Sequence, residues 1–200
     1  MFLNTTRRII SNSNDSRPNT FMQLRPRTVA PIRTTNNTNH IVAPTPIKPV
    51  MKWGAPTWTF LHTLAALIKE TSFNAIRIDL FRIVQTICTN LPCSICSNHA
   101  REYFNKLNVN TIKTKQDLIH MLFSFHNDVN KRKNVELFPL SGLNIYTQGN
   151  YKVIANNFMI HYQEKTRNIH LIADEMHRQR VIKTVKQWII DNIENIELIE

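Results

Sequence analysis

Two cysteines lie three residues apart, directly after a proline, in the stretch Leu91-Pro92-Cys93-Ser94-Ile95-Cys96-Ser97-Asn98-His99-Ala100. Proline suits the first turn of a helix, and beyond it Cys96, His99 and Tyr103 recur at helical spacing on one stripe. The free N–H groups and positive dipole end of a helix N-terminus favour the thiolate, the form of cysteine that attacks disulfides. The stretch therefore predicts a helix over 93–107 that begins with a redox-active or metal-binding pair of sulfurs.

The composition of the 200-residue chain favours an all-α fold. Glycine occurs three times, strand-like alternation is hard to find, and Leu- and Ile-rich segments repeat with helical spacing. No apolar run approaches the ~20 residues that span a bilayer, and the N-terminus lacks a hydrophobic signal core. We therefore expect one domain with an appendage, no membrane partner and no secretory signal peptide.

The cysteines and the charge narrow the class of protein further. Cys88, Cys93 and Cys96 form an odd, clustered set, which is not the framework of a disulfide-dense secreted domain. The set indicates a catalytic or metal-binding cluster. The formal net charge of +11 invites a nucleic-acid partner, but a positive field also attracts the phosphates of a cofactor. Charge alone therefore does not favour nucleic acid, and we expect no such partner.

Residues 1–50 form a separate compositional block rich in Asn, Thr, Pro and Arg, with Asp15 as its single acid. Its apolar residues are too sparse to offset the entropy of ordering, so we expect a disordered basic tail. The acid-poor, Arg-bearing composition is also similar to that of a mitochondrial transit peptide. Because no clear amphipathic helix emerges, we favour a solvated tail.

Two helices are expected before the cysteine pair. The first has Pro56 near its start, and Trp58 and His62 share a face of it at i, i+4. Taken alone, that pair is typical of core packing. Ser72 is a plausible N-cap for the second helix, over 73–90, in which Cys88 would be a small core residue near the end.

A further helix is expected over 115–131, and its end is unusually polar. His126 and Asn130 are four residues apart on one face, with Asn127 beside them, an arrangement that suits a flat, hydrogen-bonding ligand. After an irregular segment, 134–150, two more helices are expected, over 152–164 and 169–197. The last carries an apolar stripe, which would pack against the main domain or another subunit; its residues are Ile182, Val185, Ile189, Ile193 and Ile196.

Three segments occur in the order and spacing of one known family. They are Trp53-Gly54-x3-Trp58-x3-His62, Leu91-Pro92-Cys93-x2-Cys96-x2-His99 and His126-Asn127-x-Val129-Asn130. On these residues the chain resembles the ERV/ALR-type FAD-linked sulfhydryl oxidases, over roughly 52–133. Each segment alone is a weak signal, whereas all three in sequence, each on an expected helix, are a strong one.

The resemblance implies an all-α fold: a four-helix bundle that binds FAD, with a short fifth helix, over residues 51–140. The tail 1–50 and an extra helical extension, 141–200, would lie outside it. The implied activity is oxidation of protein dithiols to disulfides, with electrons passing to FAD and then to O2 to give H2O2. Homodimers are usual in the family, and relatives from large DNA viruses often carry such extensions.

Carried over position by position, the resemblance makes Cys93 the outer sulfur that exchanges with substrate and Cys96 the inner sulfur beside the flavin. It places a further group at positions that contact FAD, namely Trp58, His62, His99, His126, Asn127 and Asn130. The lysine expected after the last of these is displaced, so Lys131 or Lys133 would meet the phosphates. The chain also lacks the second cysteine pair and the shuttle Cys-x-x-Cys of many relatives, and we expect no metal.

Other interpretations remain open on sequence grounds. A zinc-stabilised, basic nucleic-acid-binding module would use a Cys3His set made of Cys88, Cys93, Cys96 and His99. A structural helical protein with an incidental Cys-x-x-Cys is a third possibility. The minimal cysteine set favours a viral protein in the host-cell cytoplasm or the virion, and the acid-poor tail gives the mitochondrial intermembrane space as the alternative.

Overall fold

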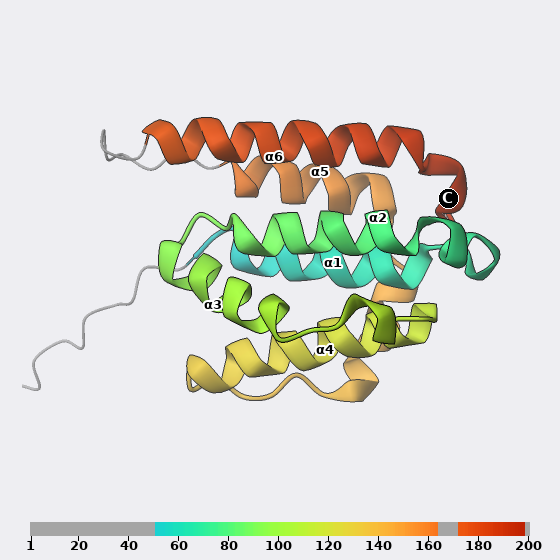
Figure 1. The fold of residues 1–200 in the computed structure, drawn as a ribbon, viewed down its shortest axis with the longest axis horizontal. Coiled ribbons are helices and arrows are strands. Elements are labelled where there is room, and N and C mark those ends of the chain that lie inside the picture. The colour runs from blue at the N-terminus through green and yellow to red at the C-terminus, as the bar shows by residue number, and fades with distance from the viewer. Residues whose placement is uncertain (1–50, 164–171, 199–200) are drawn as a thin grey trace, which may run out of the picture. The chain divides into compact units, whose positions relative to one another are not determined.

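The computed structural model describes residues 51–163 and 172–198, and the predicted tail 1–50 lies outside this part of the chain (Figure 1). Within it every regular element is helical, which confirms the all-α prediction. The α-helices are α1 (Gly54–Leu67), α2 (Glu70–Thr89), α3 (Ser94–Asn105), α4 (Lys115–Arg132), α5 (Tyr151–Tyr162) and α6 (Ile172–Asp191). Short 3-10 helices are η1 (Val109–Thr111), η2 (Leu140–Thr147) and η4 (Ile193–Asn195).

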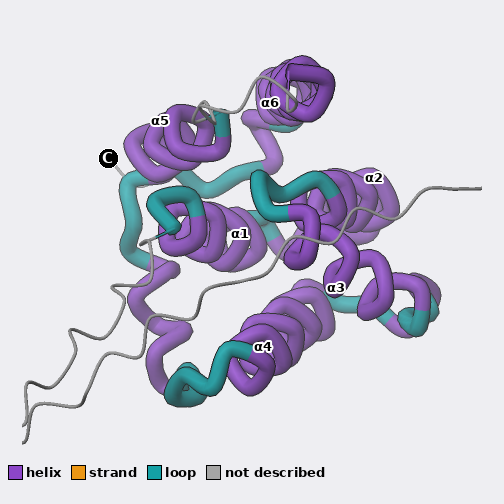
Figure 2. The backbone as a smooth tube through the Cα atoms, turned by 90° about the vertical axis from the view of Figure 1, so that its left-hand side faces the viewer, coloured by secondary structure: helices purple, strands orange, loops and turns teal. Residues whose placement is uncertain are grey.

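The helix α1 lies at the centre of the described fold. Figure 2 shows α1 and α2 between α3 and α4 on one side and α5 and α6 on the other. Phe60, Leu61 and Leu64 are fully buried in this middle layer. A helix that is apolar on nearly all sides must be covered on nearly all sides. The contacts of α1 with α4, α5 and η2 provide that cover.

Two of the expected helix starts are confirmed and one is wrong. Cys93 caps α3, and Thr114 forms a capping box with Asp117 at the start of α4. Ser72 does not cap α2, which begins at Glu70 without a side-chain cap. The Lys69 N–H donates to the Asn195 carbonyl, and Ile68 forms a β-bridge with Ile196. The C-terminal segment thereby fixes the chain just before α2 and starts the helix earlier.

The C-terminal helices pack on the main domain, which was one of the two predicted alternatives. Val181, Ile182 and Val185 of α6 are buried in the same core as α1 and α2. The predicted stripe is only partly buried, because Ile189 and Ile193 are at the edge of that core. The segment 134–150, expected to be irregular, contains the 3-10 helix η2. No helix in the described part of the chain is long and apolar enough to cross a bilayer.

Candidate functional site

Cys93 and Cys96 form a disulfide at the first turn of α3, with their Cα atoms 5.2 Å apart. The Cys96 N–H donates to the Cys93 sulfur over 3.2 Å. The preceding turn is held in place because the Ser97 hydroxyl donates to the Leu91 carbonyl over 3.1 Å. Both sulfurs therefore lie at the positive end of a helix, where a thiolate released by reduction is stabilised.

Cys96 lines a cavity of about 170 Å³ between α1, α3 and α4, which we call the inner recess. Trp58, Leu61 and Phe125 give it an apolar, aromatic wall. Cys93 does not line it. The two sulfurs of one disulfide therefore have different surroundings, and Cys96 is the one that faces the cavity.

Two further groups complete the inner recess. Trp53 and Gly54 lie at the start of α1, while Arg132 and Lys133 supply positive charge at the end of α4. No carboxylate is among the described residues that line it. The cavity thus combines a flat aromatic wall, a redox-active sulfur and a cationic edge.

A stack of aromatic and imidazole rings extends from the wall of the inner recess. Trp58 lies on His126 with ring centroids 4.1 Å apart and an interplanar angle of 11°. His62 Nε2 and His126 Nδ1 are 3.1 Å apart, and Tyr146 of η2 stacks on His62 with ring centroids 4.8 Å apart. One imidazole therefore donates to the other, and the stack joins α1, α4 and η2.

Both imidazoles of this stack are held neutral. Burial, and then the proximity of His126, lower the pKa of His62 to about 3. Burial, and then the charge of Lys133, lower the pKa of His126 to about 4. Neutral rings can share one N–H···N hydrogen bond, whereas two charged rings would repel each other.

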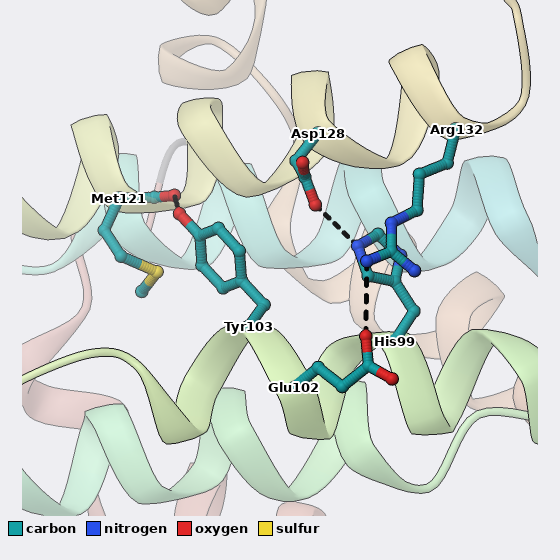
Figure 3. A network of polar contacts seen from close by, with 6 residues as sticks. All are labelled: His99, Glu102, Tyr103, Met121, Asp128 and Arg132. Atoms are coloured by element: carbon teal, nitrogen blue, oxygen red, sulfur yellow. Dashed lines mark hydrogen bonds and ion pairs between the residues drawn. The ribbon is translucent and has the colours of Figure 1, made fainter.

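A polar network fixes α3 against α4 (Figure 3). The buried His99 bonds through Nε2 to Asp128, and Arg132 donates to Glu102 over 3.2 Å. Tyr103 donates to the Met121 carbonyl over 3.3 Å. Because these contacts lie along one side of α3, they hold Cys96 in place relative to the aromatic wall.

The two asparagines of the third sequence segment bind backbone outside the inner recess. Asn127 makes two hydrogen bonds with the Phe138 backbone, of 2.8 and 3.0 Å. Asn130 donates to the Glu136 carbonyl over 3.3 Å. Their observed contacts therefore hold the chain after α4, which brings Phe138 to 5.2 Å from the ring of His126.

The structure thus divides the residues selected from sequence into two groups. Trp58, Cys96, His99 and Lys133 line the inner recess. The rest lie outside its lining; they are Cys93, His62, His126, Asn127, Asn130 and Lys131. Sequence reasoning missed Trp53, Phe125 and Arg132 as lining residues. Trp53 belongs to the first quoted segment and could have been assigned, whereas Phe125 has the pattern of any core residue.

The zinc hypothesis finds no support in the described part of the chain. Cys88 is buried, and burial raises the pKa of its thiol. Cys93 and Cys96 are bonded to each other, and His99 is engaged by Asp128. No group of three or more His, Cys, Asp or Glu side chains there is arranged to hold a metal ion.

Comparison with known proteins supports the resemblance found in the sequence. A family model described as the Erv1 / Alr family matches residues 55–149, from α1 through η2. The chain is 32% identical over 100 residues to a FAD-linked sulfhydryl oxidase of African swine fever virus (isolate Tick/Malawi/Lil 20-1/1983), covering 50% of this chain and 83% of that protein. The chain belongs to the Erv1/Alr family.

Two more distant Erv1/Alr relatives show how widely the similarity extends. A putative FAD-linked sulfhydryl oxidase of Invertebrate iridescent virus 3 is 31% identical, over 41% of this chain and 56% of that protein. The FAD-linked sulfhydryl oxidase ERV1 of Arabidopsis thaliana is 30% identical, over 43% of this chain and 44% of that protein. No solved structure matches the chain. The helices α5 and α6 lie beyond the Erv1/Alr match.

Proposed function

We propose that this protein is an FAD-linked sulfhydryl oxidase that forms disulfides in protein substrates. The observation that carries the proposal is the asymmetry of the disulfide at the start of α3. Cys96 faces an aromatic cavity, whereas Cys93 does not line it. Such an arrangement lets one sulfur contact a bound redox group while the other exchanges with a client. Membership of the Erv1/Alr family and relatives named FAD-linked sulfhydryl oxidase support it.

The residues of the inner recess fit the requirements of FAD. Trp58 and Phe125 offer flat faces for an aromatic ring system, and the buried His99 lies beside Cys96 in the same lining. Arg132 and Lys133 can meet a diphosphate, and no carboxylate in the described lining would repel it. We infer that these residues hold the cofactor, with His62 and His126 supporting Trp58. Lys131, Asn127 and Asn130 would act at the edge of the site or through the chain after α4.

The chain's own cysteines would perform thiol–disulfide exchange with the client. A client thiolate attacks the Cys93 sulfur, the Cys93–Cys96 bond breaks, and Cys96 leaves as a thiolate stabilised by the N-terminus of α3. The second client thiol then attacks the mixed disulfide and releases Cys93 as a thiolate. The client loses two electrons and two protons, and the cysteine pair gains the electrons. Bound FAD supplies a two-electron acceptor for the reduced pair and a route from there to O2, which becomes H2O2.

The experiment that tests this proposal is the visible absorption spectrum of the purified protein under air-free conditions. A flavin band that bleaches on addition of dithiothreitol and returns with O2, together with H2O2 release, is the expected result. A colourless protein that takes up no added FAD would overturn the proposal. A pigmented protein whose band is unchanged by dithiol would separate cofactor binding from the cysteine pair and would equally contradict it.

Three finer points are also proposals. We infer that O2 is the acceptor, which oxygen consumption in step with thiol loss would test. The homodimer rests on the resemblance alone, and sedimentation equilibrium of the full chain tests it.

We propose the host-cell cytoplasm or the virion as the compartment, because several relatives are viral proteins. A mitochondrial relative in Schizosaccharomyces pombe keeps the intermembrane space as the alternative, and imaging of the tagged full chain distinguishes them.

A further inference from the structure

A second cavity, which we call the outer recess, lies between the cysteine turn, the start of α3 and α6. It measures about 300 Å³. The chain neighbours of Cys93, Pro92 and Ser94, both line it, and α6 contributes His177 and Arg178. Its other lining residues are Asn90, Leu91, Ser97 and Arg101. Cys93 itself does not line the outer recess, but the residues on both sides of it in the chain do.

Arg178 is an unusual residue to find in such a place. It is only 5% exposed, and its Nε and Nη2 atoms have no hydrogen-bond partner. A guanidinium is seldom buried without a paired anion, because its removal from water is costly. Arg178 lines the outer recess, so the charge of an anion bound there would lie close to the buried guanidinium and offset the cost of its burial.

The remaining groups of the outer recess favour an anion as that ligand. Arg101 adds a second guanidinium, and the exposed side chain of His177 is held in position because its Nε2 donates to the Asn90 amide oxygen over 2.7 Å. No carboxylate is present in the described lining. The positive N-terminal end of α3 lies at the same place, since Ser94 is its first residue.

We propose that the outer recess binds a carboxylate of the thiol substrate: an acidic side chain close to the client cysteine that attacks Cys93. A buried guanidinium such as that of Arg178 favours a carboxylate in its neighbourhood through the attraction of opposite charges. The carboxylate would anchor the client while its thiolate reaches the adjacent sulfur. This inference rests on the proposed oxidase function and adds to it a class of preferred client. It also assigns a role to α6, which lies beyond the family match.

The test compares two dithiol peptides that differ only in carrying Glu or Gln beside their cysteines, with uncharged dithiothreitol as a third substrate. We expect the FAD-loaded full chain to show about tenfold higher kcat/KM for the Glu peptide, mainly through KM. In Arg178→Gln this preference should be lost while dithiothreitol turnover stays within about twofold. Arg178→Lys should restore part of it. Equal rates for both peptides in the wild type, or a preference that survives Arg178→Gln, would overturn the proposal.

Two controls make the result specific to the outer recess. Arg180→Gln removes the same charge from an exposed position of α6 outside the lining, and it should keep the preference. Loss of preference in Arg180→Gln as well would mean that only the general positive field selects acidic peptides. Arg101→Gln, at an exposed position, replaces the buried variant if Arg178→Gln does not fold, and it should reduce the preference.

Failure of the oxidase proposal is distinguishable from failure of this one. If no thiol is oxidised, binding is measured by fluorescence anisotropy with labelled Glu and Gln peptides in which serine replaces each cysteine. Tighter binding of the Glu peptide that Arg178→Gln abolishes would support the carboxylate site without any turnover. Equal binding of the two peptides would overturn it.

Discussion

The inner and outer recesses lie near the same disulfide, but they are lined by side chains of different chemistry. The inner recess is aromatic and apolar, and apart from Trp53 and Gly54 its lining residues lie within the family match. The outer recess is polar and basic, and it is completed by α6, outside that match. Cys96 lines the apolar inner recess, whereas the chain neighbours of Cys93 line the basic outer recess. We infer that electron transfer and client choice are controlled from different sides of the pair.

The largest expected effect comes from the sulfur that faces the inner recess. Cys96→Ser should lower dithiol-driven H2O2 release by at least about a thousandfold, because no other described thiol is placed to continue the relay. Cys88→Ala should keep measurable turnover, since the buried Cys88 thiol has no sulfur partner. Oxygen consumption with dithiothreitol checks both. Retained activity in Cys96→Ser would remove the functional difference between the two recesses.

The aromatic wall gives the next largest effect. Trp58→Ala should weaken FAD binding by about 10- to 100-fold, because stacking on an aromatic face contributes about 1–3 kcal/mol. Trp188 of α6 supplies the matched control: it is buried in the core, it does not line the inner recess, and its Nε1 has no hydrogen-bond partner. Trp188→Phe should leave FAD affinity unchanged. Flavin fluorescence titration measures both, and equal weakening would indicate a general loss of fold.

Acid should lower the free energy of unfolding, because His62 and His126 are neutral in the folded protein. The folded-state pKa of His62 is about 3 and that of His126 about 4, both below the ordinary value of 6.5. On acidification the unfolded chain therefore binds more protons than the folded protein. The contribution of His62 and His126 to the free energy of unfolding is complete above pH 6.5 and falls as the pH approaches 4. We expect the free energy of unfolding to fall by on the order of 2 kcal/mol over this window, a figure discounted because His126 is only partly buried.

Urea unfolding at pH 7, 6, 5 and 4 measures this loss. His62→Gln should flatten the acid side of the profile, because the depressed group is gone. His120→Gln, at an exposed position of α4, is the control and should retain the wild-type profile. A wild-type free energy of unfolding that stays constant between pH 6.5 and 4 would contradict the neutral-imidazole stack.

The residues around the inner recess could be predicted from the sequence better than those around the outer recess, for a physical reason. The cysteine pair, its helix and the shared face of Trp58 and His62 follow from local spacing, which periodicity reveals. The start of α2 was misplaced because a contact from the C-terminal segment overrides the Ser72 cap. Arg178 was not selected at all, since its burial depends on how α6 packs against the rest of the chain.

The backbone contacts of Asn127 and Asn130 could not be predicted from the sequence, and the predicted contacts of these residues with FAD stay a proposal. Their shared position with His126 at the end of α4 was interpreted as a ligand-binding face. In the structure both side chains bond the backbone of 136–138. A polar side chain on a helix face satisfies the nearest backbone groups, and the location of those groups depends on a loop that periodicity does not describe.

The smallest expected effect tests how α5 supports the turn between the two recesses. The buried Tyr162 hydroxyl lies 2.9 Å from the Ile87 carbonyl and 2.6 Å from that of Asn90, directly before the cysteine turn. Tyr162→Phe should lower the free energy of unfolding by about 1–2 kcal/mol, because the Asn90 carbonyl loses this donor and the Ile87 carbonyl keeps only the Asn90 N–H. Tyr151, on the same helix, is equally buried, but its hydroxyl has no partner. Tyr151→Phe should therefore be neutral or slightly stabilising, and equal losses in urea unfolding would show that the hydroxyl of Tyr162 does not support the turn.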